Sequence, residues 1–136
     1  MLQAALRADA LTSTEDGFEL RIGLPWIRSM PVSSVRDLAV TIDGSLVPDV
    51  GVVLRGRRVG PQELAGEAGW WFLQDRLVLV GDRPLAPGSH AVSVDFRLLV
   101  PYLQAGPGAP LVLPFSLEAD LVLDDTPVPS LSRDVA

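Results

Sequence analysis

The chain has 136 residues, of which 48% are apolar and 21% are charged, and its formal net charge is −6. This length is enough for one domain with a hydrophobic core, and the composition is typical of a globular soluble protein. Because an acidic chain is repelled by phosphate groups, we expect no nucleic-acid partner and no binding to anionic membranes. The sequence has no cysteine, lysine or asparagine, which excludes disulfides, a Schiff-base lysine and N-linked glycosylation. The N-terminus does not resemble a signal peptide and no segment is apolar enough to span a membrane, so we expect a cytoplasmic protein.

Apolar and polar side chains alternate with a period of two along most of the chain, which predicts β-strands. In chain order the predicted strands cover residues 4–11, 18–24, 38–42, 46–47, 52–54, 71–74, 76–80, 90–100 and 111–123. The only plausible helix is one turn at residues 61–66, with proline at its start and glycine at its end. The predicted fold class is all-β: an antiparallel two-sheet β-sandwich or a jelly-roll-like fold, with at most one short helical turn. We expect a single domain over residues 1–124 and an extended C-terminal tail over residues 125–136.

Side chains that perform catalysis are scarce in this sequence. His90 is the only histidine and follows a Pro-Gly turn, a position typical of a surface or turn residue, whereas a metal site usually needs several such ligands. The sequence has no G-x-S-x-G, G-x-G-x-x-G or Walker motif. Asp120, Asp124 and Asp125 could bind Ca²⁺ or Mg²⁺, but without an EF-hand pattern a solvated acidic edge is the better interpretation. We therefore predict no catalytic residue and no metal ligand in this chain.

All three tryptophans lie in two short segments. Pro25 and Pro31 frame a stiff loop that contains Trp26, and tryptophan, arginine and methionine are enriched at protein interfaces. Trp70 and Trp71 should point to opposite faces of an extended segment, so that one fills the core and the other meets solvent, a sugar or a partner. The alternative is that each tryptophan only covers the end of the sandwich. The predicted partner interface comprises Trp26, Arg28, Met30, Trp70, Trp71 and Arg76.

The same segments carry a resemblance to a known family. They are residues 18–33 (FELRIGLPWIRSMPVS), a strand ending in IDG at 42–44, and the runs 71–76 (WFLQDR), 85–90 (LAPGSH) and 99–102 (LVPY). In this order and spacing, over roughly residues 15–120, they resemble the small (β) subunit of bacterial C-glycoside deglycosidases. The first dozen residues and the segment after residue 124 add nothing to the resemblance.

The resemblance implies a β-sandwich subunit that works only within a hetero-oligomer. It implies a larger catalytic α subunit, similar to xylose-isomerase-type TIM barrels, that holds a divalent metal, expected to be manganese, and the acid–base residues. It also implies that the complex cleaves the C–C bond between a sugar and a flavonoid or other polyphenol by β-elimination, after a separate oxidoreductase has made the 3-oxo sugar. No cofactor is expected in this chain.

Two other functions fit the residues. One is a free-standing carbohydrate-binding module that stacks exposed tryptophans on sugar rings, although the linker and signal peptide that usually accompany such modules are not seen. The other is a small autonomous enzyme with a site made only of carboxylates. Either would act without a partner subunit.

Overall fold

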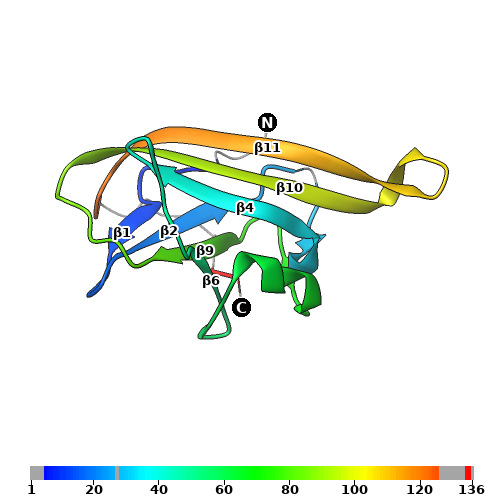
Figure 1. Ribbon diagram of the computed structural model, residues 1–136, viewed down its shortest axis with the longest axis horizontal. Helices are drawn as coiled ribbons and strands as arrows, with labels where there is room; N and C mark the ends of the chain where they lie inside the picture. The colour runs from blue at the N-terminus through cyan, green and yellow to red at the C-terminus, as the bar shows by residue number, and fades with distance from the viewer. Residues whose placement is uncertain (1–4, 27, 126–133, 136) are drawn as a thin grey trace.

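The computed structural model describes residues 5–26, 28–125 and 134–135, and for residues 101–105 the backbone alone. Its strands form two facing layers, and every strand pair within the sheets is antiparallel (Figure 1). The first sheet has the order β1 (Leu11–Ser13), β2 (Phe18–Gly23), β9 (Arg76–Gly81), β6 (Gly51–Leu54), β7 (Arg57–Val59). The second has the order β11 (Ala109–Val122), β10 (Ser89–Gly106), β4 (Val35–Ile42), β5 (Ser45–Leu46). A separate ribbon pairs β3 (Met30–Pro31) with β8 (Trp70–Trp71), and the predicted all-β fold class is confirmed.

The core lies between the two sheets because each long strand turns every second side chain inward. On β2, Phe18, Leu20 and Ile22 are fully buried, while Glu19 and Arg21 lie on the outer face. The inward positions of β10 from 92 to 100 are buried in the same way. This burial of apolar surface is the main source of stability for such a sandwich.

Several elements differ from the prediction. The helical turn at 61–66 is the 3₁₀ helix η2 (Pro61–Gly66), and a second turn, η1 (Val32–Ser34), was not predicted. The predicted strand over 4–11 begins outside the described residues, and its described part is not a strand before Leu11. The N–H of Ala10 donates to the carbonyl of Arg7, and this turn interrupts the extended backbone. The predicted strand over 71–74 is shorter, because the N–H of Asp75 donates to the carbonyl of Phe72 and closes a turn.

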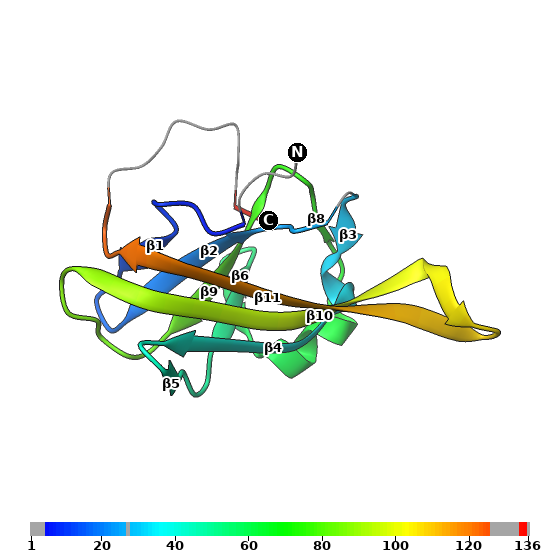
Figure 2. The same ribbon diagram turned by 90° about the horizontal axis from the view of Figure 1, so that it is seen from above.

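The β10–β11 hairpin extends beyond the rest of the sandwich (Figures 1 and 2). The pairing of β4 with β10 ends at Val35 and Leu98, so farther along the hairpin each strand pairs only with the other. The hairpin register shifts between Val100 and Gln104 and again before Gly106, which produces bulges near the tip. We call residues 99–112 of this hairpin the arm.

The C-terminal segment returns to the first sheet. Residues 126–133 and 136, which include most of the predicted extended tail, lie outside the described residues. Asp134 forms a parallel bridge with Arg76, and the N–H of Val135 donates to the Arg76 carbonyl at 2.9 Å. Val135 is 5% exposed, so the described part of the tail is packed against the domain and does not extend away from it. None of the helices in the described ranges has the length and apolarity of a membrane span.

Candidate partner-binding surface

The loop after β2 brings Trp26 against a row of aromatic rings. Pro25 has no N–H to donate, so the strand pairing of β2 ends at Gly23 and the chain turns away. Trp26 is half-buried, and its ring meets Phe115 edge-on, with centroids 6.3 Å apart. Phe115 stacks on its cross-strand neighbour Phe96 at 5.6 Å, and Phe96 contacts Trp71 at 6.0 Å. This aromatic row connects the loop to the core.

Met30 and Trp71 support the surface from the inside. They face each other in the β3–β8 ribbon and both are fully buried. The indole N–H of Trp71 donates to the carbonyl of Asp75 at 3.1 Å, which satisfies its one polar atom. The structure therefore places these two predicted interface residues in the core, where they do not reach a partner directly.

Trp70 lies on the opposite face of β8 and is exposed, as the alternation predicted. It is 52% exposed, and the turn that follows adds Phe72 at 48% and Leu73 at 42%. The N–H of Leu73 donates to the hydroxyl of Ser29 at 3.0 Å, which connects this turn to the Trp26 loop. We call Trp70, Phe72 and Leu73 the exposed apolar turn. Single exposed apolar residues are ordinary, but a contiguous group of large ones marks an interaction surface.

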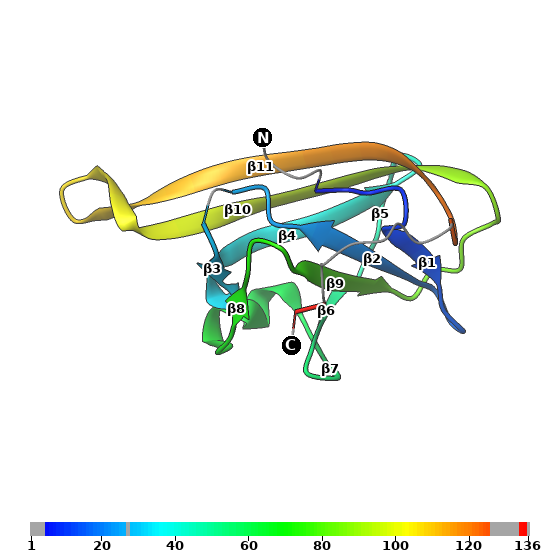
Figure 3. The ribbon, with the colours of Figure 1, turned by 180° about the vertical axis from the view of Figure 1, so that it is seen from behind.

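The exposed apolar turn and the arm lie at the same end of the molecule. In Figures 2 and 3 the β3–β8 ribbon is at the end from which the arm projects. Arg28 is exposed in the loop between Trp26 and β3, so it also belongs to this end. Of the six predicted interface residues, Arg28, Trp70 and the half-buried Trp26 are the ones that reach this surface.

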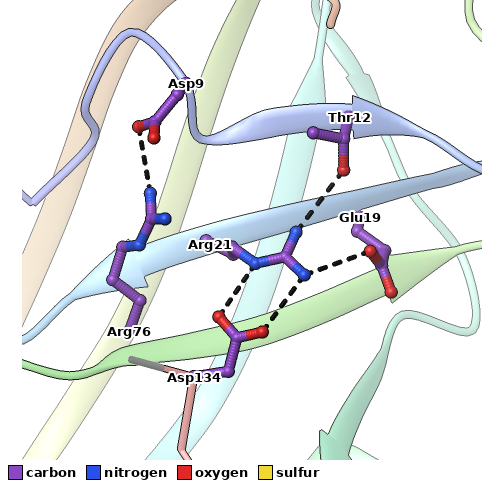
Figure 4. Close-up of polar contacts among 6 residues, drawn as sticks. All are labelled: Asp9, Thr12, Glu19, Arg21, Arg76 and Asp134. Atoms are coloured by element: carbon purple, nitrogen blue, oxygen red, sulfur yellow. Dashed lines mark hydrogen bonds and ion pairs between the residues drawn. The ribbon is translucent and has the colours of Figure 1, made fainter. Parts of the chain in front are cut away.

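Arg76 belongs instead to a charged cluster on the outer face of the first sheet (Figure 4). Its guanidinium is 3.0 Å from the carboxylate of Asp9, and both side chains are largely buried. Burial, followed by repulsion from Arg76, lowers the pKa of Arg7, and Asp9 opposes this shift. The pKa of Arg21 is raised. Burial acts to lower this pKa, but the hydrogen bond and charge of Asp134, followed by those of Glu19, outweigh the effect of burial. These contacts indicate that Arg76 has a structural role.

His90 also has a structural role. Its Nδ1 is 2.6 Å from a carboxylate oxygen of Asp43, and its Nε2 is 2.6 Å from the carbonyl of Ala86. Because both ring nitrogens face acceptors, the imidazolium form satisfies both contacts, and the pKa of His90 is raised by the Asp43 bond first and the Ala86 bond second. The other Asp43 oxygen accepts from the N–H of Ala91 at 2.9 Å. The turn after β4 is thereby fixed to the start of β10.

Candidate ligand sites elsewhere are weak. The described residues contain no group of three or more His, Cys, Asp or Glu side chains that could hold a metal ion. The carboxylate of Asp124 accepts hydrogen bonds from the hydroxyl and from the N–H of Ser13. These two bonds, the hydroxyl bond first, lower the pKa of Asp124. An open groove of about 850 Å³ lies between β4 and η2, where Arg58 pairs with Asp82 at 2.7 Å and donates to the carbonyl of Asp49. These charged groups already have partners within the chain.

Sequence reasoning missed Phe72, Leu73 and Phe115. The turn that exposes Phe72 and Leu73 was predicted as a strand, and alternation in a strand would have placed one of them inside. The contact of Phe115 with Trp26 depends on the pairing of distant strands, for which the local sequence carries no signal.

Comparison with known proteins identifies the family. A model of the family named C-glycoside deglycosidase beta subunit matches residues 3–102. A C-glycoside deglycosidase beta subunit from Arthrobacter globiformis is 35% identical over 96 residues, which cover 66% of this chain and 73% of that protein. A 3'-dehydrocarminate deglycosidase beta subunit from a Microbacterium species is 30% identical over 107 residues, which cover 76% of this chain and 80% of that protein. The chain that carries the aromatic row and the exposed apolar turn belongs to the C-glycoside deglycosidase beta subunit family.

Proposed function

We propose that this chain is the non-catalytic β subunit of a C-glycoside deglycosidase complex. A larger α subunit of the TIM-barrel type performs the chemistry, and the two form a hetero-oligomer. The complex cleaves the C–C bond of 3-oxo-C-glycosides. Membership of a family of beta subunits supports a role within a complex, and the exposed apolar turn is the observation that carries the assignment of a docking role.

The proposed reaction is a β-elimination. The 3-keto group acidifies the neighbouring C2–H, so a base can remove that proton and leave an enolate. The electron pair then forms the C1=C2 double bond while the bond from C1 to the aglycone breaks, and the released aglycone carbon takes a proton. Such a reaction needs a base, an acid and a group that stabilises the enolate.

The histidine and the metal-ligand side chains among the described residues give no support for placing that set in this chain. His90 is hydrogen-bonded on both nitrogens, and no group of metal-ligand side chains is found among the described residues. The proposal therefore assigns the divalent metal, expected to be manganese, and the acid–base residues to the α subunit. The role of this chain is to bind that subunit and hold its loops in position.

The contacts proposed for docking differ in their roles. Trp70, Phe72 and Leu73 present apolar area that a partner can cover. Arg28 is exposed in the loop between Trp26 and β3, and arginine is a residue type enriched at interfaces. Trp26 packs on Phe115 and shapes the edge of the surface. Replacing a central tryptophan anchor at an interface costs about 2 kcal/mol or more.

Co-expression with a candidate TIM-barrel α subunit tests the proposal. The two proteins should co-elute in size exclusion, and a 3-oxo-C-glucoside should be cleaved only when both are present. Activity of this chain alone would overturn the assignment and support the autonomous enzyme. Loss of co-elution in a Trp26→Ala variant would assign Trp26 to the interface. If the variant still forms the complex, Trp26 does not belong to the interface.

The half-exposed indole of Trp70 also favours a second candidate, a free-standing carbohydrate-binding module. An exposed indole can stack on the apolar face of a sugar ring. Isothermal titration of the isolated chain with unmodified sugars separates the two functions. Saturable binding that Trp70→Ala abolishes, with no association with the TIM-barrel subunit, would favour the module.

A further inference from the structure

The arm lies within a long uncharged segment. Residues 98–117 contain no Asp, Glu, Lys, Arg or His, although charged residues make up 21% of the chain. Twenty residues at that frequency would hold about four charges. A projecting surface element is normally among the most polar parts of a soluble domain, so the absence of charge here needs an explanation.

One face of this uncharged hairpin has no cover among the described residues, whereas Val100, Leu111 and Leu113 on the other face pack against the core. Beyond the Val35–Leu98 pair, β10 and β11 have no third strand beside them. Val112 is 40% exposed, and Leu111 and Leu113 are each partly exposed. An isolated two-stranded ribbon is only marginally stable in water, so its apolar side chains favour contact with another surface.

A second copy of this chain is a poor occupant for that surface. Pro110 in the arm and Pro114 just beyond it are four residues apart on the edge strand β11, and neither has an N–H to donate to an added strand. Edge-to-edge pairing of two arms would therefore lack donors where it needs them. Two copies, each with a net charge of −6, would also repel one another.

The partner subunit is the occupant that fits the arm. The arm projects from the same end of the molecule as the exposed apolar turn, so one partner can contact both (Figures 2 and 3). Because the arm carries no charge, it disfavours a partner that presents charged groups to it.

We propose that the arm, residues 99–112, lies in an uncharged, apolar groove of the catalytic partner subunit and extends the contact made by the exposed apolar turn. This inference rests on the proposed function, because it requires that the complex exists. It assigns to the arm a part in partner choice that is separate from the anchoring role of Trp70.

A matched pair of substitutions tests the arm. Val112 and Val122 are at even positions of β11, face the same side of the sheet and are 40% and 45% exposed. They are about 33 Å apart along the strand, and only Val112 is in the arm. Val112→Asp introduces a charge that an apolar groove must desolvate, whereas Val122→Asp is the same change at the other end of the hairpin. Val112→Thr keeps the shape and adds only a hydroxyl.

The measurement is the Kd for the TIM-barrel subunit by titration calorimetry, with thermal unfolding of each variant to confirm that it is folded. We expect Val112→Asp to raise Kd at least about tenfold, Val112→Thr to raise it less, and Val122→Asp to leave it within about twofold. Equal Kd values for Val112→Asp and Val122→Asp would overturn the arm proposal while leaving the complex in place. Failure of the wild-type chain to bind would instead overturn the proposed function. Self-association of the wild-type chain that Val112→Asp abolishes, with partner binding intact, would assign the arm to a second copy.

Discussion

The adjacent tryptophans of β8 allow binding and stability to be tested separately. Trp70 is 52% exposed, whereas Trp71 is fully buried and donates its indole N–H to the Asp75 carbonyl. Trp70→Ala should weaken association with the partner subunit and change folding only modestly. Trp71→Phe should destabilise the fold and leave association nearly unchanged. Because the two residues are adjacent on β8, any general disturbance of this strand should affect both variants alike, so each variant is a control for the other.

The magnitudes follow from exposed area. A tryptophan side chain has up to about 250 Å² of surface, so an exposed fraction of 52% leaves roughly 130 Å² for a partner to cover. At about 25 cal/mol per Å², covering that area stabilises the complex by at most about 3 kcal/mol, roughly a hundredfold in Kd. Trp70→Ala should cost about 1 kcal/mol of folding free energy, because half of the indole is already in water. Trp71→Phe should cost about 2–3 kcal/mol, because it leaves a void and removes one hydrogen bond.

Two assays on the same preparations measure these effects. Urea unfolding of the isolated chain gives the change in folding free energy. Titration with the partner subunit, under conditions where each variant is fully folded, gives Kd. A Kd for Trp70→Ala within about threefold of wild type would refute the exposed apolar turn as the anchor. If Trp71→Phe raised Kd as much as Trp70→Ala, the effect would be one of packing, and the argument from exposure would be wrong.

Two further predictions concern stability. The pKa of His90 is raised above its ordinary 6.5, so its ion pair with Asp43 contributes full stability below about pH 6.5, and that contribution is lost as pH rises through the folded-state value. Urea unfolding at about pH 6 and about pH 9 should show this loss in wild type and a flatter profile in His90→Gln, and parallel profiles would contradict it. Ending the chain after residue 133 removes the buried Val135 and should lower the melting temperature by an amount equivalent to about 2 kcal/mol. Asp134→Asn should cost well under 1 kcal/mol, because Asp134 is 47% exposed in its pair with Arg21, and an equal loss in both variants would show that the ion pair dominates.

The sequence predicted the parts of the fold that depend on near neighbours. Alternation on β2 and β10 identified their inward faces, because a strand turns successive side chains to opposite sides whatever it pairs with. The same rule separated Trp70 from Trp71 before either had a known environment. It failed at 71–74, where the hydrogen bond from Asp75 to Phe72 closes a turn and ends the alternation.

Contacts between distant segments could not be predicted in this way. The Trp26–Phe115 and Phe96–Phe115 contacts depend on the register of β10 against β11, which one sequence does not specify. Met30 was assigned to a partner interface because its residue type is common there, but its pairing with Trp71 buries it. Residue type thus does not indicate which side chains face outward.

The buried side of the β3–β8 ribbon also explains why its outer side suits docking. Trp71 is fixed by its bond to Asp75 and by its pairing with Met30, and the direction of Trp70 follows because it is the next residue on the same strand. The bond from Leu73 to Ser29 holds the adjoining turn against the Trp26 loop. A surface that is already ordered loses little conformational entropy on binding, so more of its buried apolar area appears as affinity. The arm has less support, because beyond Leu98 each strand pairs only with the other and only one face packs against the core. Part of any contact energy must therefore offset the ordering of the arm. In the proposed complex the exposed apolar turn should therefore supply most of the affinity, while the arm contributes chiefly to the choice of partner.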